Sequence, residues 1–393
     1  MKHDASLFLE VEYSQRRKQG QNICGDVFKS QKYDGGSRVI AVLSDGLGSG
    51  VKANILAGMT ATMALRFAVS DLDFLHSAEV MMDALPVCQV RKISYATFTI
   101  VDCTANGVAQ IIEMDNPPFL FLRNGTAQPL SRREMVSPKW RDRVLRFART
   151  EIQPEDRIVF ASDGITQAGL GSPDYPLGWR HRNFSAFVRE QLAATPGISA
   201  RDLANAVVRE ALTKETRHHA MDDMTCGVIY FRRPRKLIAL TGPPFDKSRD
   251  GEYARMAADY DGKRVICGGT TTTIVSRELN RPVRLDLQTM SRDLPPLSVM
   301  DGVDLITEGI LTLTRAARIL EEREVLNNDD PAARLARLFI ESDIIEFVVG
   351  SRINEAHQDP KLPIDLEIRR NIVKRVANAL ETQYLKETSI TCI

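Results

Sequence analysis

The sequence has no long hydrophobic run and almost no net charge. No window approaches the roughly 18 uninterrupted apolar residues of a membrane span, and the amino-terminal segment lacks the apolar stretch and cleavage site of a secretory signal. The 52 Lys and Arg against 51 Asp and Glu leave a net charge of +1, which gives no global field to attract nucleic acid or an anionic membrane. We therefore expect a cytoplasmic protein with no nucleic-acid partner and no membrane partner.

Cysteine and histidine are scarce, and neither is spaced for metal binding. The six cysteines form no CxxC pair and the six histidines show no metal-ligand spacing, which argues against a structural zinc site and against a dense disulfide framework. We expect reduced thiols in the core, contributed by Cys24, Cys88, Cys103, Cys226, Cys267 and Cys392.

The chain is too long for a single hydrophobic core. Its 393 residues exceed the size at which one core usually stops growing, and a composition of 43% hydrophobic and 26% charged residues is that of an ordinary globular protein. The pattern is broken by a basic run with a proline, typical of a solvated linker: Arg232-Arg233-Pro234-Arg235-Lys236. We predict a first domain over residues 1–235 and a second over residues 236–393.

The first part of the chain mixes strand and helix patterns. Residues 53–68 are dominated by Ala, Leu and Met and predict a helix, and residues 199–212 predict a second helix with Ser199 as its N-cap. Segments 94–101, 107–114 and 118–122 predict an antiparallel meander. Further strands are predicted over residues 7–13, 38–43, 156–161 and 225–231. This order favours an α+β domain over an alternating parallel sheet.

The second part reads as strand, glycine turn and helix, which predicts a smaller α/β domain with strands over 237–240, 264–267 and 344–349. Gly268 and Gly269 precede four threonines between a strand and a helix. Their amides and hydroxyls could bind an anion at the helix N-terminus, although an ordinary N-capped turn is the simpler interpretation.

Aspartates stand at the ends of four predicted strands, each beside a glycine or a second acid. An Asp-Gly pair alone is more often a turn than a ligand. Carboxylates at strand ends can converge on hard divalent cations, and a neighbouring glycine lets a backbone carbonyl approach. The set therefore indicates a metal site built from Gly25-Asp26, Asp45-Gly46, Asp163-Gly164 and Asp222-Asp223.

Five motifs, taken in order, resemble the metal-dependent protein phosphatases related to protein phosphatase 2C, and within them the stage II sporulation protein E (SpoIIE) type. They are Gly25-Asp26-Val27-Phe28, Ser44-Asp45-Gly46-Leu47-Gly48-Ser49-Gly50 with Ala53 following, Asn116-Pro117-Pro118, Ala161-Ser162-Asp163-Gly164-Ile165 and Asp222-Asp223-Met224-Thr225. The resemblance covers nearly all of the first domain and implies an antiparallel β-sandwich flanked by helices, an α/β/β/α arrangement. It also implies two divalent cations, Mn²⁺ or Mg²⁺, at one end of the sandwich.

The same resemblance assigns roles to single residues. Asp45 would bridge the two cations, Asp26 and the Gly46 carbonyl would hold one of them, and Asp163 and Asp222 would hold the other. A water bridging two cations has a lowered pKa and can attack phosphorus in line, so Asp45, Asp163 and Asp222 are the expected catalytic residues. The implied substrate is a protein carrying phosphoserine or phosphothreonine.

One departure concerns the phosphate-binding Arg that many members place shortly before the first aspartate. Here Gln21 lies in that region, and Arg17 or Lys18 could substitute, although basic residues in such a connection are usually solvated. A non-enzymatic phosphoprotein-binding scaffold is therefore one alternative. A phosphatase gated by ligand binding to the second domain, which could also form a homodimer, is another.

Two further features have competing interpretations. Gly48, Ser49 and Gly50 could cradle a phosphate, but without a Lys of the Walker type a tight turn that positions Asp45 is preferred. His218 or His219 could act as a general acid, whereas an exposed pair with no role is the simpler interpretation.

Overall fold

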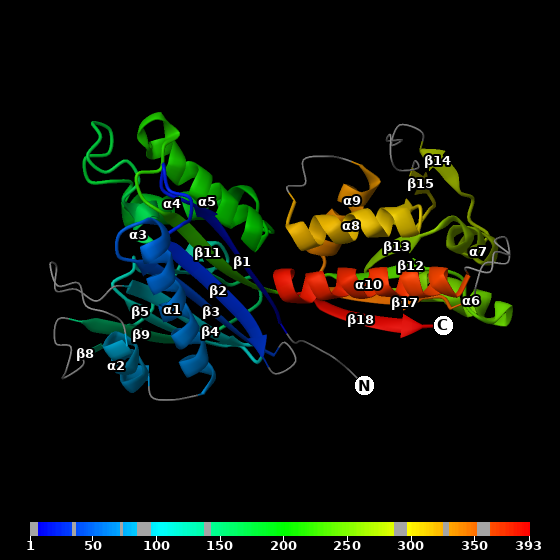
Figure 1. The fold of residues 1–393 in the computed structure, drawn as a ribbon, viewed down its shortest axis with the longest axis horizontal. Helices are drawn as coiled ribbons and strands as arrows, with labels where there is room; N and C mark the ends of the chain where they lie inside the picture. The colour runs from blue at the N-terminus through cyan, green and yellow to red at the C-terminus, as the bar shows by residue number, and fades with distance from the viewer. Residues whose placement is uncertain are drawn as a thin grey trace. The chain divides into compact units, whose positions relative to one another are not determined.

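The structure is a computed structural model that describes residues 7–33, 37–70, 74–84, 96–136, 143–286, 297–324, 330–351 and 362–393. The chain divides into two compact units, Met1–Arg233 and Pro234–Ile393 (Figure 1). Cys88 and the predicted strand start at Ser94 lie outside the described residues. Of the other cysteines, four are buried as expected and Cys392 is exposed. Within the described ranges, no helix combines the length and the apolar character needed to cross a membrane.

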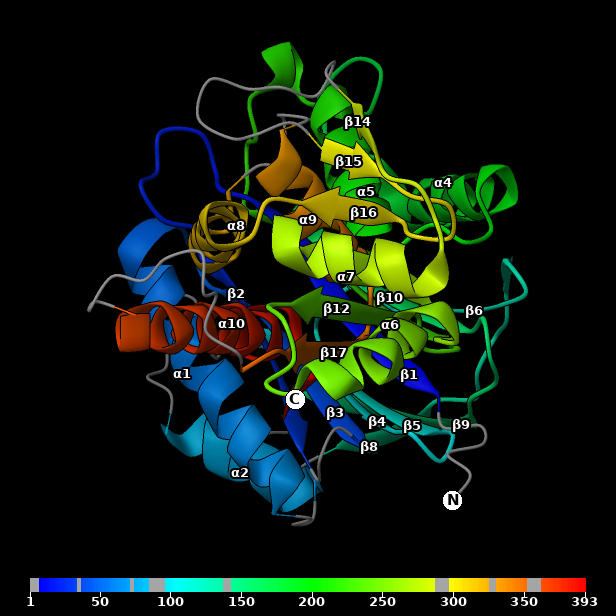
Figure 2. The ribbon, with the colours of Figure 1, turned by 90° about the vertical axis from the view of Figure 1, so that its right-hand side faces the viewer.

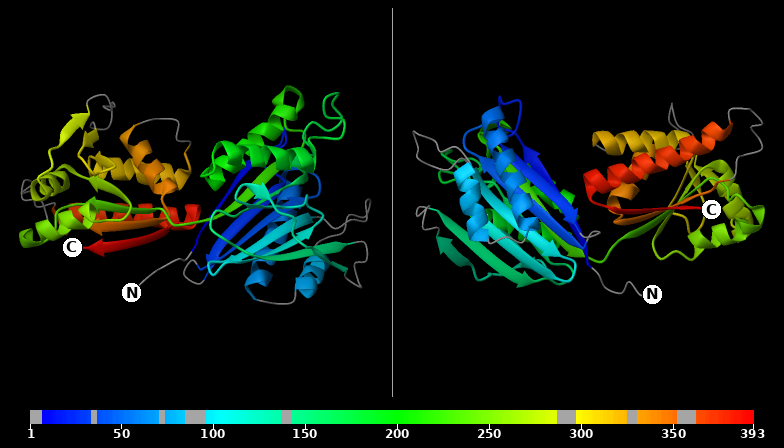
Figure 3. Two further views of the ribbon diagram at one scale, coloured as in Figure 1. Left: turned by 180° about the vertical axis from the view of Figure 1, so that it is seen from behind. Right: turned by 60° about the horizontal axis from the view of Figure 1, so that its bottom comes forward.

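Two antiparallel sheets form the first unit, and their faces pack together (Figure 3). One has the order β1-β11-β10-β6-β7 and the other the order β2-β3-β4-β5-β9-β8. The strands are β1 Phe8–Arg16, β2 Asp26–Tyr33, β3 Arg38–Gly46, β4 Ala96–Thr104, β5 Val108–Met114, β6 Leu120–Arg123, β7 Thr126–Ala127, β8 Arg133–Val136, β9 Val144–Glu151, β10 Arg157–Ala161 and β11 Met224–Arg232.

Helices cover the outer face of each sheet (Figure 3). Helices α1 (Gly50–Val69) and α2 (Phe74–Ala84) pack on the sheet of β3 and β4, whereas α4 (Arg180–Ala194) and α5 (Ala200–Lys214) pack on the sheet of β10 and β11. A short helix, α3 (Asp163–Thr166), follows β10. The predicted α/β/β/α sandwich is thereby confirmed.

The N-cap of α5 shows how local sequence sets an element. The Ser199 hydroxyl accepts a hydrogen bond from the Asp202 amide at 3.0 Å, and Asp202 lies in the first turn, where a negative charge is favourable. The predicted helix and its cap are confirmed.

The predicted three-strand meander is wrong in its last strand. Strands β4 and β5 pair as expected, but β5 then pairs with β9, and β6 joins the other sheet beside β10. Asp115 has a φ of +59°, and Pro117 and Pro118 have no amide hydrogen to continue a ladder. The chain therefore leaves one sheet after Met114 and enters the other.

The basic run between the units is not simply a solvated linker. Arg232 belongs to β11, is 3% exposed and forms an ion pair with Glu10 of β1 at 2.8 Å. A buried guanidinium is tolerated only with such a partner. Only the later part of the run joins the two units.

The second unit is a doubly wound sheet with the order β14-β15-β16-β13-β12-β17-β18, in which β16, β13, β12, β17 and β18 are parallel. Helices α6 and α7 pack on one face and α8, α9 and α10 on the other (Figure 2), which confirms the predicted α/β domain. The elements are β12 Lys236–Thr241, α6 Asp250–Ala258, β13 Lys263–Cys267, α7 Gly269–Leu279, β14 Arg284–Asp286, β15 Leu297–Val299, β16 Leu305–Thr307, α8 Ile310–Glu322, α9 Pro331–Glu341, β17 Ile344–Val349, α10 Leu362–Tyr384 and β18 Glu387–Cys392.

Candidate metal centre of the first unit

Two of the predicted metal aspartates face each other across the pair of β2 and β3. Asp26 and Asp45 are direct cross-strand neighbours, so their side chains lie on the same face of the sheet. Asp26 is 2% exposed. A Cβ on Gly46, the last residue of β3, would lie 2.1 Å from the Ala53 carbonyl oxygen, so only glycine allows α1 to approach this closely.

The other aspartates come from the sheet of β10 and β11. Asp163 is the first residue of α3 and is separated from the end of β10 by Ser162 alone. Asp222 and Asp223 directly precede β11. A Cβ on Gly164 would lie 2.1 Å from the Asp223 carbonyl oxygen, so the two segments touch at this glycine. The structure thus brings the ends of strands from both sheets to one place.

A chain of hydrogen bonds fixes Asp26. The Thr225 hydroxyl donates to Asp26 Oδ2 at 2.7 Å. The side-chain amide of Gln15 donates to the Thr225 hydroxyl and to the backbone carbonyl of Asp26, both at 3.0 Å. The Thr225 amide in turn donates to the Ser162 hydroxyl at 2.9 Å. Gln15, Ser162 and Thr225 therefore orient the acid, and among them only Ser162 and Thr225 lie in a predicted motif.

The pKa values of the acids show how strongly their charges interact. Burial, and then the neighbouring Asp26 and Asp163, raise the pKa of Asp45 to about 10. Burial raises the pKa of Asp26 to about 7, with Asp223 and Asp163 adding to the rise against the hydrogen bonds from Thr225 and Ser162. The pKa of Asp222 is also raised, chiefly by burial. Carboxyls that disfavour their own charge in this way are suited to a cation.

The donor set fits hard divalent cations. Asp26 Oδ1 and Asp223 Oδ2 are buried and have no hydrogen-bond partner among the described residues. Oxygen-only donors from carboxylates and a carbonyl are what Mg²⁺ and Mn²⁺ prefer. Across the described ranges, however, no three His, Cys, Asp or Glu side chains are gathered tightly enough to form a ready cluster of metal ligands.

Asp223 was predicted to be only a neighbour of the metal ligand Asp222, but it is the more buried of the two acids. It is 3% exposed, and its Oδ1 accepts a hydrogen bond from the Lys18 amide at 2.9 Å. A Cβ on Gly25 would lie 2.7 Å from its Oδ2. Asp222 is half-buried and accepts a hydrogen bond from the Asp223 amide at 2.9 Å. Sequence spacing alone cannot decide which of two adjacent acids before a strand is the metal ligand, because burial determines which side chain points inward.

Asn116 is a supporting residue whose role the sequence did not reveal. It is 5% exposed, and its amide donates to the Thr99 hydroxyl at 3.0 Å and to the Leu43 carbonyl at 3.5 Å. It therefore ties the exit of β5 to β4 and to β3, the strand that carries Asp45. Its place in the Asn-Pro-Pro motif was the available signal.

The remaining candidates of the first unit lie as the simpler interpretations predict. His218 and His219 are exposed. Gly48 and Gly50 have φ values of +102° and +72°, which describes a tight turn between β3 and α1. Arg17 donates to the Asn22 carbonyl at 3.0 Å.

The glycine-threonine segment of the second unit uses its hydroxyls internally. The Thr272 and Thr273 hydroxyls donate to the Gly268 and Gly269 carbonyls at 2.9 and 3.0 Å. Gly268, with a φ of +119°, is the N-cap of α7. These two hydroxyls are therefore occupied by the helix itself.

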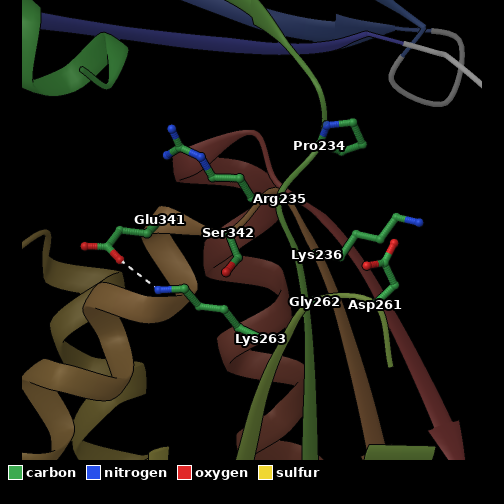
Figure 4. Close-up of a pocket in the computed structure, with 8 residues that line it drawn as sticks. All are labelled: Pro234, Arg235, Lys236, Asp261, Gly262, Lys263, Glu341 and Ser342. Carbon is green, nitrogen blue, oxygen red and sulfur yellow. Dashed lines mark ion pairs between the residues drawn. The ribbon is translucent and has the colours of Figure 1, made fainter. Parts of the chain in front are cut away.

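A polar pocket of about 560 Å³ lies at the amino ends of β12 and β13, and Figure 4 shows its lining. Lys263 points to Glu341, with Nζ and Oε2 3.5 Å apart, while Lys236 and Asp261 lie on the other side. Charges of both signs select no single class of ion. In doubly wound sheets ligands bind at the carboxyl ends of the strands, which is the opposite edge.

Comparison with known proteins bears on the first unit. The family described as "Stage II sporulation protein E (SpoIIE)" matches residues 35–232, half of the 393-residue chain. No curated protein matches the chain in sequence.

Several solved phosphatase structures are similar to the chain. The phosphatase domain of SpoIIE from Bacillus subtilis has 14% identity, covers 59% of this chain and 95% of its own, and gives a TM-score of 0.45. The RsbU and RsbW domains of Rv1364c from Mycobacterium tuberculosis have 16% identity, covering 66% and 73%, with a TM-score of 0.46. RsbX in complex with magnesium has 17% identity, covering 57% and 95%, with a TM-score of 0.38. Because these TM-scores are low, the family assignment rests on the sequence match: the chain belongs to the stage II sporulation protein E (SpoIIE) family of protein phosphatase 2C-like protein phosphatases.

Proposed function

We propose that the first unit hydrolyses phosphoserine and phosphothreonine esters of proteins, using two divalent cations, Mn²⁺ or Mg²⁺. The observation that carries the proposal is the convergence of Asp26, Asp45, Asp163 and Asp222 from both sheets. Asp26, Asp163 and Asp222 each raise the pKa of Asp45, as neighbouring like charges do.

In this proposal each acid has a role set by its position. Asp45 is a cross-strand neighbour of Asp26 and also feels the charge of Asp163, and it would bridge the cations. Asp26 and the Gly46 carbonyl would hold one cation, and Asp163 and Asp222 the other. When bound, the two cations would lower the pKa of a bridging water and neutralise charge on the phosphoryl oxygens.

The chain's own residues would keep this site rigid. The Thr225 hydroxyl holds Asp26 Oδ2, so that its buried Oδ1 stays directed to the site. The Gln167 amide donates to Asp163 Oδ2 at 2.9 Å, which orients that acid in the same way. Preorganised acids need little rearrangement when charge develops on the phosphate.

Turnover of a phosphoserine peptide by the purified chain tests this function. We expect hydrolysis with Mn²⁺, none with EDTA, and a loss of about 100-fold or more in Asp45→Asn and in Asp163→Asn. Peptide binding without turnover would instead favour the non-enzymatic scaffold. A cytoplasmic location and a homodimer belong to the same proposal and need separate measurements.

A second candidate is a phosphatase gated by a ligand of the second unit. The parallel order β16-β13-β12-β17-β18 supports this candidate. The helices that follow the neighbouring strands β12 and β17 pack on opposite faces of the sheet. Ligands of doubly wound sheets bind at the carboxyl ends of two such strands. Melting and turnover of the full chain with ATP, GTP and NAD test gating. If none of these nucleotides shifts either quantity, nucleotide gating fails.

A further inference from the structure

Three exposed apolar side chains lie close in sequence to the predicted metal ligands. Met221 directly precedes Asp222 and is 65% exposed, and Ile23 lies in the connection that leads to Asp26 and is 38% exposed. Val51, the second residue of α1, is 62% exposed. A single exposed apolar side chain is ordinary, but a group of them around one site indicates a surface that another molecule covers.

The connection between β1 and β2 meets α1 on one of its borders. The Asn54 side-chain amide donates to the Cys24 carbonyl at 2.9 Å, and a Cβ on Gly25 would lie 3.0 Å from the Ala53 side chain. Residues three apart on a helix share a face, so Val51 lies on the face of α1 that carries Asn54. Ile23, the neighbour of Cys24, and Val51 therefore border the same contact.

The other border of this connection meets the segment that precedes β11. The Gln19 amide donates to the Ala220 carbonyl at 2.8 Å, and the Lys18 amide donates to Asp223 Oδ1 at 2.9 Å. Met221 lies between these two contact points in the sequence. The connection thus has Met221 on one side and α1 on the other, and the three apolar side chains form a rim beside the acids.

The substrate is the molecule that this apolar rim would meet. The chain belongs to a family of protein phosphatases, and serine is a short side chain, so a phosphoserine that reaches the acids brings its neighbouring residues onto the surface around them. Apolar neighbours would remove the rim from water, which is favourable. The exposed charges of the same segments, Arg17 and Lys52, do not distinguish apolar from uncharged polar neighbours.

We propose that Ile23, Val51 and Met221 select phosphorylated sites whose flanking residues are apolar. This inference deepens the proposed function and rests on it for the position of the phosphate. The rim residues determine specificity and take no part in the chemistry, so their replacement changes the affinity for flanking residues and leaves the metal centre as it is.

A matched pair of peptides tests this selection. One has Leu and Val on both sides of the phosphorylated position and the other has Ser and Gln, with equal length and net charge. Both carry a phosphonate in place of the phosphate ester, so that no turnover is needed. Fluorescence anisotropy with the Mn²⁺-loaded full chain measures the dissociation constants, and we expect the wild type to bind the apolar peptide about tenfold more tightly.

Variants of the rim locate the preference. Met221→Gln and Val51→Gln should each weaken binding of the apolar peptide about threefold or more and leave that of the polar peptide within about twofold. Met221→Leu should retain the preference, because the side chain stays apolar. Met59→Gln is the matched control, since Met59 is also exposed on α1 but lies about two turns further along the helix. It should change neither constant.

The outcomes separate this inference from the proposed function. A preference that is lost only in Met221→Gln and Val51→Gln, with thermal melting unchanged, supports the inference even if the wild type hydrolyses no phosphoserine peptide, in which case the proposed function alone fails. Equal binding of both peptides by the wild type, or binding of neither, overturns the inference, and hydrolysis would then leave the proposed function standing. An equal loss in Met59→Gln or in Met221→Leu overturns it as well.

Discussion

The Thr225 hydroxyl donates to Asp26 Oδ2 at 2.7 Å across 199 residues of sequence. Thr225 belongs to β11 of one sheet and Asp26 to β2 of the other, so this buried bond joins the two sheets at the acidic site. Neither residue could be linked to the other from the sequence, because the bond depends on how the sheets stack.

Replacing Thr225 by Val keeps the shape and removes this bond. We expect Thr225→Val to lower the free energy of unfolding of the first unit by about 1–3 kcal/mol, because the buried Asp26 Oδ2 loses the hydroxyl that donates a hydrogen bond to it. Thr150→Val, at a partly exposed strand position, should stay within about 0.5 kcal/mol. Denaturant unfolding measures both, and equal effects of the two substitutions would contradict the account.

Gly46 and Gly58 provide a matched pair of glycines. A Cβ on Gly46 would lie 2.1 Å from the Ala53 carbonyl oxygen, whereas a Cβ on Gly58 of α1 would have no described atom within 4 Å. We expect Gly46→Ala to destabilise by about 1–3 kcal/mol and to reduce Mn²⁺ affinity, because α1 must shift. Gly58→Ala should stabilise by about 0.5–1 kcal/mol, since alanine is the better helix residue. A Gly46→Ala variant as stable as the wild type would rule out this close approach.

Glu113 makes stability depend on pH. It is 1% exposed, and burial raises its pKa from 4.5 to about 7, against the opposing effects of the Phe119 amide and Arg132. The folded state therefore keeps a proton that the unfolded state releases between about pH 4.5 and 7, and this contribution to stability is lost as pH rises through 7.

Glu113→Gln keeps the acceptor for the Phe119 amide, which donates to Glu113 Oε1 at 2.6 Å, and removes the titration. As pH rises from 5 to 8, we expect the free energy of unfolding of the variant to increase relative to that of the wild type, by up to about 3 kcal/mol. Denaturant unfolding at both pH values measures the difference. A difference between variant and wild type that does not change with pH would show that Glu113 stays ionised in the folded protein.

Two lysines of the second unit differ in burial. Lys386 is 5% exposed, with Nζ 3.4 Å from Oδ1 of the fully buried Asp343, whereas Lys263 and Glu341 form an exposed pair (Figure 4). We expect Lys386→Met to destabilise the second unit by about 3–5 kcal/mol, because Asp343 loses its cation, and Lys263→Met to cost less than about 1 kcal/mol. Thermal unfolding distinguishes them, and similar effects would argue against a buried pair.

The sequence predicted those features that depend on local pattern. The α5 helix with its Ser199 cap and the α/β character of the second unit are confirmed. The β-sandwich, which the family resemblance implied, is confirmed as well. The crossing of β6 between sheets was missed, because hairpin-like spacing does not say which strand becomes the partner. The predicted metal ligands stay a prediction, since the aspartates are neighbours but burial also favours Asp223, which spacing ranked second.

The number of Mn²⁺ ions bound per chain tests the central claim most directly. Calorimetric titration of metal-free protein should give two sites in the wild type and in Arg16→Met, and fewer sites or much weaker binding in Asp45→Asn, because Asp45 is assigned to both ions. No Mn²⁺ binding by the wild type, or two undiminished sites in Asp45→Asn, would contradict a metal centre built on Asp26, Asp45, Asp163 and Asp222.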